Sequence, residues 1–321
     1  MSSGKVFAVT GGAGFIGSHL VDRLLSEGAS RVYVIDDFSS GALANLDAWK
    51  SDDRLVVVKG DVRRRQDLAC LREADGVVHL AATKHNPSKS APDALIETNI
   101  NGTYNVLEEA RRGKAARVLF ASSLYVYGVE KPGPFSERSP LLSRTLYGAT
   151  KIAGENLCRA MAEKSSYRAV VLRYFFIYGP RLYQKNYANS LLPKTLRRTL
   201  EGQPPEIFGD GEQTFDYLYI RDAIELTYRA LVCEHQAEVL NLCSGTGVTV
   251  NQVVSQLCEL TGFSGEPISS PPDETAGSVR TGDPSLWKAS LKPKALTPLA
   301  EGLAESLKWW QQTRQIAAPK Q

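Results

Sequence analysis

The sequence lacks any apolar run of the roughly 18–20 residues that a membrane-spanning helix needs. Its first residues also lack the basic and then apolar pattern of a secretory signal peptide. We therefore expect a soluble protein of the cytoplasm with no membrane partner.

Cysteine is scarce, and concentrated positive charge is missing. The five cysteines are odd in number and widely spaced, which fits neither a disulfide framework nor a zinc site, so we expect reduced thiols and no metal. The net charge is +3, from 38 basic and 35 acidic residues, far from the basic stripe of a nucleic-acid-binding protein. We expect no nucleic-acid partner and interpret the basic run 63–65 as a solvated helix face.

What the sequence does contain is a tyrosine and a lysine four residues apart, Tyr147 and Lys151. On a helix this spacing places both side chains on one face. A neighbouring cation favours the phenolate, and so lowers the pKa of a phenol from its reference value of roughly 10 toward the neutral range. The pair is therefore suited to removing a proton from an alcohol.

A glycine-rich turn near the start of the chain gives this pair its context. An apolar segment runs into Gly11, Gly14 and Gly17 and then into a segment with one apolar face. This order is typical of a dinucleotide site, because small residues let backbone N–H groups approach the pyrophosphate. The next apolar segment ends in Asp36, where a carboxylate can accept from the adenosine ribose and would repel a 2′-phosphate. We predict NAD as the cofactor, in preference to NADP.

Apolar segments alternate with helical patterns along the chain, which predicts a parallel sheet flanked by helices. Its strands are expected over 5–10, 31–36, 55–59, 76–81, 117–122, 168–174 and 237–242. The fold class is thus α/β: a doubly wound, Rossmann-type parallel sheet with a smaller, discontinuous α/β substrate lobe. We expect the NAD-binding domain to span 1–175 and about 220–247, and the substrate lobe to span about 176–219 and 248–321.

Further motifs follow in a fixed order. They are 11–17 (GGAGFIG), 60–62 (GDV), 79–82 (HLAA), 99–107 (NINGTYNVL), 119–128 (LFASSLYVYG), 172–181 (LRYFFIYGPR) and 207–217 (IFGDGEQTFDY). With Tyr147 and Lys151, they make nearly the whole chain resemble the extended short-chain dehydrogenase/reductase family, and within it the nucleotide-sugar epimerases and dehydratases. The resemblance implies a nucleotide-sugar substrate, a catalytic role for Ser123, and a homodimer formed through helices at 99–112 and 147–163.

Motifs and resemblance together give the expected site. The catalytic residues are Ser123, Tyr147, Lys151 and Tyr125. The cofactor-binding residues are Gly11, Gly14, Phe15, Ile16, Gly17, Asp36, Asp37, Phe38, Ser39, Ser40, Asp61, Val62, Leu80, Ala81, Ala82, Asn99, Ser122, Tyr147, Lys151 and Tyr174. The substrate-binding residues are Lys84, His85, Ser123, Leu124, Tyr125, Phe176, Arg181, Leu192, Phe208 and Arg280.

Some positions near the expected catalytic residues depart from the pattern of the family. Leu124 stands where 4,6-dehydratases usually carry an acid, and its side chain cannot protonate a leaving hydroxyl. Tyr125 replaces a small residue of the epimerases, and its phenol is either a second acid or base or a packed aromatic. Lys84 and His85 are more polar than the usual residues, and either face the sugar or belong to a solvated loop.

Two aromatic residues stand where the family contacts the nucleotide. Phe176 replaces an Asn and Phe215 replaces an Arg that would bind the diphosphate. A diphosphate without cations would bind weakly, so either Arg181 and Arg280 compensate or the nucleotide is held differently.

Oxidation of a nucleotide sugar at C4 gives a ketone that acidifies the C5 hydrogen and permits 4-epimerisation, 4,6-dehydration or 5,6-dehydration. Leu124 argues against 4,6-dehydration, and the whole chain also resembles the UDP-N-acetylglucosamine 5,6-dehydratases of tunicamycin-type antibiotic biosynthesis. We therefore expect a lyase that 5,6-dehydrates a UDP-hexosamine (UDP-GlcNAc) and returns the hydride to the sugar, with a UDP-hexose or UDP-hexosamine 4-epimerase as the alternative. Tyr125, Lys84 and His85 are the candidates for the group that assists loss of the 6-hydroxyl. A net reductase would usually use NADPH, against which Asp36 argues. A non-catalytic dinucleotide sensor would not need Ser123, Tyr147 and Lys151.

Overall fold

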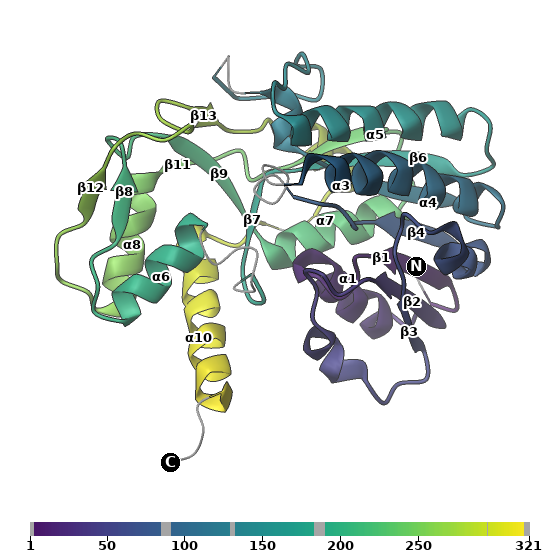
Figure 1. Ribbon diagram of the computed structural model, residues 1–321, viewed down its shortest axis with the longest axis horizontal. Helices are drawn as coiled ribbons and strands as arrows, with labels where there is room; N and C mark the ends of the chain where they lie inside the picture. The colour runs from purple at the N-terminus through teal and green to yellow at the C-terminus, as the bar shows by residue number, and fades with distance from the viewer. Residues whose placement is uncertain (1–2, 85–90, 129–131, 183–189, 294, 318–321) are drawn as a thin grey trace.

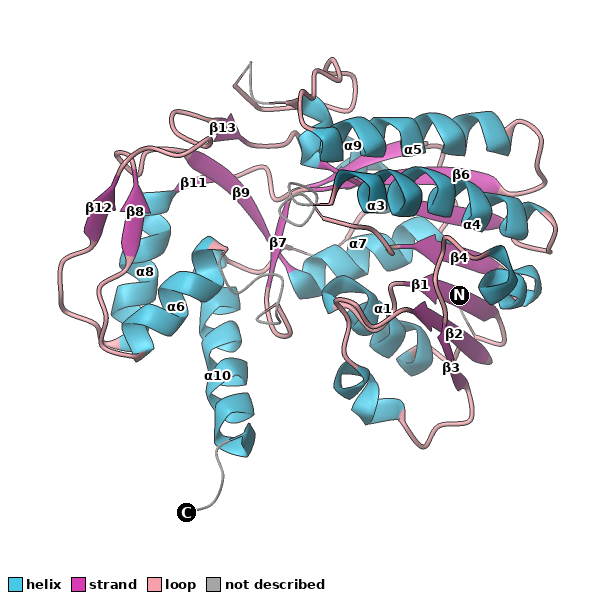
Figure 2. Ribbon diagram, in the orientation of Figure 1, coloured by secondary structure: helices cyan, strands magenta, loops and turns pink. Residues whose placement is uncertain are grey.

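A computed structural model of the protein describes residues 3–84, 91–128, 132–182, 190–293 and 295–317. A seven-stranded sheet forms the centre of its larger part (Figures 1 and 2). In spatial order the strands are β10 (Val239–Leu242), β6 (Arg168–Tyr174), β5 (Arg117–Ser123), β4 (Gly76–His79), β1 (Val6–Thr10), β2 (Arg31–Asp36) and β3 (Leu55–Lys59).

Every neighbouring pair in this sheet is parallel. The seven strands predicted from the sequence and the doubly wound α/β fold are confirmed, with strand bounds that differ by about two residues or fewer. From β1 the chain continues to β2 and β3 on one side, and it then returns to β4 on the other side of β1. The strand order therefore reverses between β1 and β4, and in such sheets ligands bind beyond the carboxyl ends of the strands at this point.

Helices cover both faces of the sheet. One face packs against α1 (Phe15–Ser26) and α7 (Ile220–Val232), and the other against α4 (Gly102–Arg111) and α5 (Leu146–Ala162). Successive strand residues point to opposite faces, so Phe7 and Val9 join the core beneath α1 whereas Ala8 joins the core beneath α4. Burial on both faces explains why these strands read as continuous apolar runs.

The smaller part of the molecule lies at the left of Figure 1. Its four-stranded sheet consists of β7 (Phe176–Tyr178), β9 (Thr214–Tyr219), β11 (Gly247–Thr249) and β13 (Val279–Arg280). A parallel pair, β8 (Glu206–Phe208) and β12 (Ile268–Ser270), lies beside it, with α6 (Leu191–Leu200), α8 (Val250–Thr261) and α10 (Leu299–Ala317). A capping box of Thr249 and Gln252 begins α8, and Gly262, with φ +71°, ends it.

The remaining elements are short. They are η1 (Leu43–Trp49), η2 (Arg65–Glu73), α3 (Pro92–Ile96), η3 (Glu97–Asn101), η4 (Leu124–Tyr127) and α9 (Ser285–Leu291). The last of them, α9, packs against α7 and β10. The five cysteines are free thiols. Within the described ranges, no helix has the length and apolar character needed to cross a bilayer.

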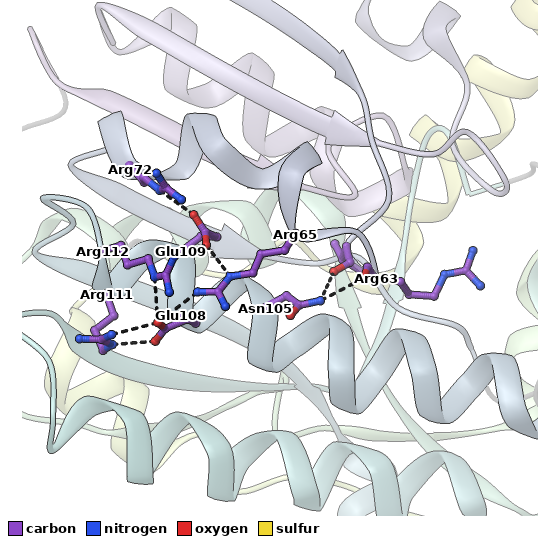
Figure 3. A network of polar contacts seen from close by, with 9 residues as sticks. Arg63, Arg65, Arg72, Asn105, Glu108, Glu109, Arg111 and Arg112 are labelled. Atoms are coloured by element: carbon purple, nitrogen blue, oxygen red, sulfur yellow. Dashed lines mark hydrogen bonds and ion pairs between the residues drawn. The ribbon is translucent and has the colours of Figure 1, made fainter.

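Acids pair with most of the arginines on the outer side of α4 and η2 (Figure 3). Glu108 and Glu109, both buried, bind four arginines at 2.6–2.9 Å: Arg65, Arg72, Arg111 and Arg112. Arg63 pairs with Asp61 at 2.5 Å. Within the basic run 63–65, Arg63 and Arg64 are exposed and pair with acids close to them in the sequence, as a solvated face would. Arg65 differs, because it packs against Glu108 and Glu109 of α4.

Candidate active site

The glycine turn between β1 and α1 has no room for side chains at two positions. A Cβ on Gly11, whose φ is +70°, would lie 2.8 Å from the backbone nitrogen of Ala81. A Cβ on Gly17 would lie 2.2 Å from the carbonyl oxygen of Gly11. The turn thus brings the N-terminus of α1 to the edge of the sheet, where its first backbone N–H groups can bind a pyrophosphate.

Asp36 ends β2 on the same edge and is held in place by the turn. Its Oδ2 accepts a hydrogen bond from the backbone N–H of Ala13, and its Oδ1 accepts one from Phe38, both at 2.9 Å. Burial raises the pKa of this carboxyl, and the two N–H groups counteract part of that rise. An ionised carboxylate has about four lone-pair sites, so sites remain for the hydroxyls of a ribose.

The residues expected to transfer the proton come from β5 and α5. Thr145 caps α5 by accepting from the N–H of Gly148 at 3.1 Å, and the helix then presents Tyr147 and Lys151 one turn apart. Lys151 is buried, donates to the carbonyl of Ala121 at 2.8 Å, and places its Nζ 5.8 Å from the centre of the Tyr147 ring. Burial lowers the pKa of this ammonium to about 8.

Tyr125 lies directly against Tyr147. Their rings meet edge to face with centroids 5.6 Å apart. Ser123 fixes the start of the short helix that carries Tyr125, because its Oγ accepts from the N–H of Tyr125 at 3.3 Å. Both tyrosines line one cavity together with Ser123.

This cavity has a volume of about 590 Å³, a size that suits a small-molecule site. Of the residues expected at the cofactor, eighteen line it: Gly11, Gly14, Phe15, Ile16, Gly17, Asp36, Asp37, Ser39, Ser40, Asp61, Val62, Leu80, Ala81, Ala82, Ser122, Tyr147, Lys151 and Tyr174.

The other two expected cofactor residues lie behind the cavity wall. Phe38 packs its ring against the core and contributes only its N–H, to Asp36. Asn99 is buried, and its Oδ1 accepts from the N–H of Thr83 at 2.8 Å. Its Nδ2 donates to the carbonyl of Thr83 at 3.0 Å and to the hydroxyl of Thr150 at 3.1 Å. Its structural effect is to join the segment after β4 to the catalytic helix.

Six of the expected substrate residues line the same cavity: Lys84, Ser123, Tyr125, Phe176, Leu192 and Phe208. Lys84 lies in the electrostatic range of Asp36, and burial lowers the pKa of its ammonium to about 7. Lys84 therefore lies in the wall of the cavity and not in a solvated loop. His85 lies outside the described residues.

Leu124 and Arg181 lie elsewhere. Leu124 is buried in an apolar cluster with Val126, because the short helix η4 turns its side chain inward. Arg181 has a φ of +68° and forms an ion pair with Asp22 at 2.8 Å. Neither lines the cavity, so Arg181 does not replace the missing diphosphate-binding arginine there.

Arg280 is buried behind two rings of the cavity wall. Its guanidinium lies 5.7 Å from the centre of the Tyr125 ring and 5.8 Å from that of Phe215. Among the described residues, no acceptor pairs with its buried Nε atom. The position follows from the sheet, because β13 pairs with β9 in a register that sets Arg280 opposite Phe215.

Sequence reasoning placed no role on several residues that line the substrate end of the cavity. They include Lys194, Glu206, Gln213, Phe215, Tyr217, Asp273 and Glu274. For Phe215 a signal was available, because it replaces a diphosphate-binding Arg of the family in the motif at 207–217. Lys194 and Glu206 belong to no motif, and only the packing of α6 beside β8 brings them together.

Comparison with known proteins identifies the family. The NAD dependent epimerase/dehydratase family matches residues 7–243. The chain belongs to this family. The match spans the glycine turn, both catalytic segments and the returning strand β10, so it covers the elements that build the cofactor half of the cavity.

Relatives differ in the reaction that their names state. A UDP-N-acetyl-alpha-D-glucosaminuronate decarboxylase of Bacillus cytotoxicus is 35% identical over 79% of this chain and 79% of its own length. A putative UDP-glucose 4-epimerase of Methanocaldococcus jannaschii is 32% identical over 94% of this chain and 97% of its own. A solved double mutant of the dTDP-glucose 4,6-dehydratase DesIV from Streptomyces venezuelae, with NAD bound, has a TM-score of 0.88 at 28% identity, covering 97% and 98% of the two chains.

The cofactor of the protein is NAD. The family is NAD dependent, and the site fits the group. The tight turn of Gly11 and Gly17 presents the N-terminus of α1 to the cavity, and Asp36 lines the same cavity and can accept hydrogen bonds from the ribose hydroxyls. The protein is thus an NAD-dependent enzyme of the nucleotide-sugar epimerase, dehydratase and decarboxylase group.

Proposed function

We propose that the protein oxidises the C4 hydroxyl of a UDP-linked hexosamine and then removes water across C5 and C6, with UDP-N-acetylglucosamine as the favoured substrate. The observation that carries this proposal is the contact between Tyr125 and Tyr147, at 5.6 Å between ring centres, in the wall of one cavity. A first phenol suffices to oxidise the sugar, and a second one is available for the elimination.

The first step uses Tyr147, Lys151 and Ser123. Tyr147 takes the proton of the C4 hydroxyl, and the nearby Lys151 ammonium stabilises the phenolate that is needed for this transfer. Ser123 lines the same cavity and can relay the proton through its hydroxyl. When bound, NAD accepts the C4 hydride and later returns it.

The second step needs an acid or base near C5 and C6 of the sugar. The 4-ketone acidifies C5, so Tyr125 can take the C5 proton and deliver it to the hydroxyl that leaves C6 as water. A C5–C6 double bond forms as the C6–O bond breaks. The hydride then returns to C4, and Tyr147 returns the proton to the C4 oxygen, so that the net change is loss of one water.

The usual 4,6-dehydratase route is less well supported. It needs an acid beside the catalytic serine, and here Leu124 occupies that place in the sequence with its side chain buried in an apolar cluster. The proposal accordingly joins the chain to the UDP-N-acetylglucosamine 5,6-dehydratases of tunicamycin-type antibiotic biosynthesis, which it resembles over its whole length.

Incubation with UDP-N-acetylglucosamine in heavy water, followed by proton NMR, tests the reaction. We expect vinyl signals of a 5,6-ene, retention of hydrogen at C4, and no net NADH after turnover. A product that differs from the substrate only in configuration at C4 would overturn 5,6-dehydration and establish 4-epimerisation. The second candidate is favoured by the putative 4-epimerase that is 32% identical over 94% of the chain.

We also propose a homodimer that forms through α4 and α5. Apolar side chains are exposed on this side of the molecule: Ile96 on α3, Tyr104 on α4 and Leu146 at the start of α5. Light scattering of the purified protein tests the assembly. We expect the mass of two chains, and a reduced mass when Tyr104 is replaced by Glu.

A further inference from the structure

Arg280 is a buried cation without an acidic partner. It is 4% exposed, and a buried guanidinium without a counter-ion is costly. Among the described residues, no acid forms an ion pair with it and no acceptor pairs with its Nε atom. Its guanidinium faces two aromatic rings instead, Tyr125 at 5.7 Å and Phe215 at 5.8 Å from the ring centres. A negative charge beside this cation would therefore be stabilised.

The backbone on both sides of Arg280 is anchored. The N–H of Gly133 donates to the carbonyl of Val279 at 2.9 Å, and the N–H of Phe135 donates to the carbonyl of Thr281 at 2.8 Å. The strand β13 also pairs with β9. The main chain from which the guanidinium extends is therefore held in place.

The acid on β9, Asp216, is turned away from this cation. Asp216 follows Phe215, and successive strand residues point to opposite faces. Both oxygens of its carboxylate accept hydrogen bonds at 2.6–3.1 Å, from the backbone and hydroxyl of Ser244 and from the N–H groups of Gly245 and Gly282. These donors stabilise the buried carboxylate, so it does not serve the arginine as a counter-ion.

Of the two rings that face Arg280, only that of Tyr125 can carry a negative charge. Tyr125 is half-buried in the cavity wall. A base must begin its step without its proton, but a phenol with the reference pKa of roughly 10 is almost fully protonated at neutral pH. An opposite charge within about 4–6 Å favours the ionised form, and Arg280 lies at such a distance from the ring.

The other titratable groups around Tyr125 do not supply this charge. Tyr147 meets its ring edge to face, and the Nζ of Lys151 lies 5.8 Å from the centre of the Tyr147 ring. Within the apolar cluster that packs against Tyr125, burial raises the pKa of Tyr127 to about 12 and also raises the pKa of the Cys243 thiol, so both stay neutral. Each phenol of the cavity thus has a cation of its own.

We propose that Arg280 is a positioning residue that stabilises the phenolate of Tyr125 and so prepares this tyrosine to take the C5 proton. The inference rests on the proposed function, in which Tyr125 is the base of the elimination. Tyr125 begins the step as a phenolate, takes the C5 proton, and is a phenolate again once that proton has left with the C6 hydroxyl as water. Arg280 does not line the cavity and its guanidinium stays protonated, so it acts through the ring.

Carbon-13 NMR of protein with labelled tyrosine measures the ionisation of Tyr125 without any substrate. The Tyr125 signal is identified by its absence from Tyr125→Phe, and the NAD-loaded protein is titrated to about pH 11, above the reference pKa of a phenol. We expect the pKa of Tyr125 to be higher in Arg280→Met than in the wild type by at least about one pH unit, because the opposite charge is lost. Arg280→Lys keeps the charge and should keep most of the effect.

Lys288→Met is the matched control. Lys288 is an exposed cation outside the cavity lining, and its Nζ lies 5.7 Å from the centre of the Trp287 ring. Its loss should leave the titration of Tyr125 unchanged. The same titration of Tyr125 in the wild type and in Arg280→Met would overturn the inference. If UDP also bound more weakly to Arg280→Met in that case, the arginine would serve a bound phosphate instead.

The pH dependence of the elimination gives a second readout. In a single turnover at neutral pH, NADH from C4 oxidation should disappear about tenfold more slowly in Arg280→Met than in the wild type, because fewer Tyr125 phenols are ionised. The difference should shrink as the pH rises. A variant that is equally slow at every pH would show that Arg280 only supports the structure of the site. Product NMR judges the proposed function separately, because the titration of Tyr125 needs no substrate and no turnover.

Discussion

Glu155, on α5, binds the guanidinium of Arg173, on β6, through both of its carboxylate oxygens, at 2.6 and 2.9 Å. Ser122, the neighbour of Ser123, donates to the same carboxylate at 2.5 Å. Glu155 also lies one helical turn after Lys151, and its charge counteracts part of the fall in pKa that burial imposes on that lysine. One buried carboxylate therefore joins β5, β6 and α5 beside Lys151 and Ser123, the residues proposed to transfer the proton.

Replacing Glu155 by Gln should destabilise the protein strongly. Both partners are almost fully buried, and the variant leaves the Arg173 charge without a counter-ion. We expect the free energy of unfolding to fall by about 3–5 kcal/mol, measured by urea unfolding. Glu301→Gln is the control, because its ion pair with Arg221 is more than half exposed and 3.9 Å long, and should cost less than about 1 kcal/mol. Similar losses in both variants would contradict a special role for the buried pair.

Replacing Tyr147 or Tyr125 by Phe should impair different steps of the reaction. Tyr147→Phe removes the group that takes the C4 proton, so we expect a loss of C4 oxidation of at least about 10²-fold with NAD still bound. Tyr125→Phe should still oxidise C4 but eliminate water slowly, so that NADH and the 4-ketone accumulate. Absorbance of the reduced nicotinamide during a single turnover distinguishes the two. If Tyr125→Phe turns over at the wild-type rate, Tyr125 acts only as a packed aromatic residue and is not the acid or base of the elimination.

Asp36→Asn should weaken NAD binding more than NADP binding. A hydrogen bond to a charged group contributes about 1.5–3 kcal/mol, so we expect the Kd for NAD to rise by roughly 10- to 100-fold. The Kd for NADP should change little, because the lost charge also repelled its 2′-phosphate. Fluorescence titration of cofactor-free protein measures both constants. Asp47→Asn, at an exposed position on η1, serves as the control; an equal loss for both cofactors would show that Asp36 acts only by holding the turn.

The sequence predicted the sheet and the cofactor half well because local rules act there. Continuous apolar runs mark strands that are buried on both faces, and the glycines at 11 and 17 mark backbone contacts that a Cβ would prevent. Parallel strands end on one edge, so Asp36, Ser123 and the residues after β4 had to meet.

The substrate half was less predictable because it depends on packing between distant segments. The sequence spacing of Leu124 does not reveal that η4 turns its side chain into an apolar cluster. Arg181 is a cation in a suitable motif, but Asp22 on α1 pairs with it. Lys194 and Glu206 meet only after α6 and β8 have packed, and no local pattern indicates that pairing.

Lys84 should make stability depend on pH in the alkaline range. Burial lowers the pKa of its ammonium to about 7 in the folded protein, whereas an unfolded lysine titrates near 10.4. Between these values the unfolded chain holds the additional proton, so the free energy of unfolding should rise with pH there. Lys84→Met lacks the group, so the difference between wild type and variant should grow from pH 7 to pH 10, by less than about 1.4 kcal/mol per pH unit because solvent screens a partly exposed group. Urea unfolding of the NAD-free proteins measures both curves, and parallel curves would show that Lys84 remains charged beside Asp36 throughout.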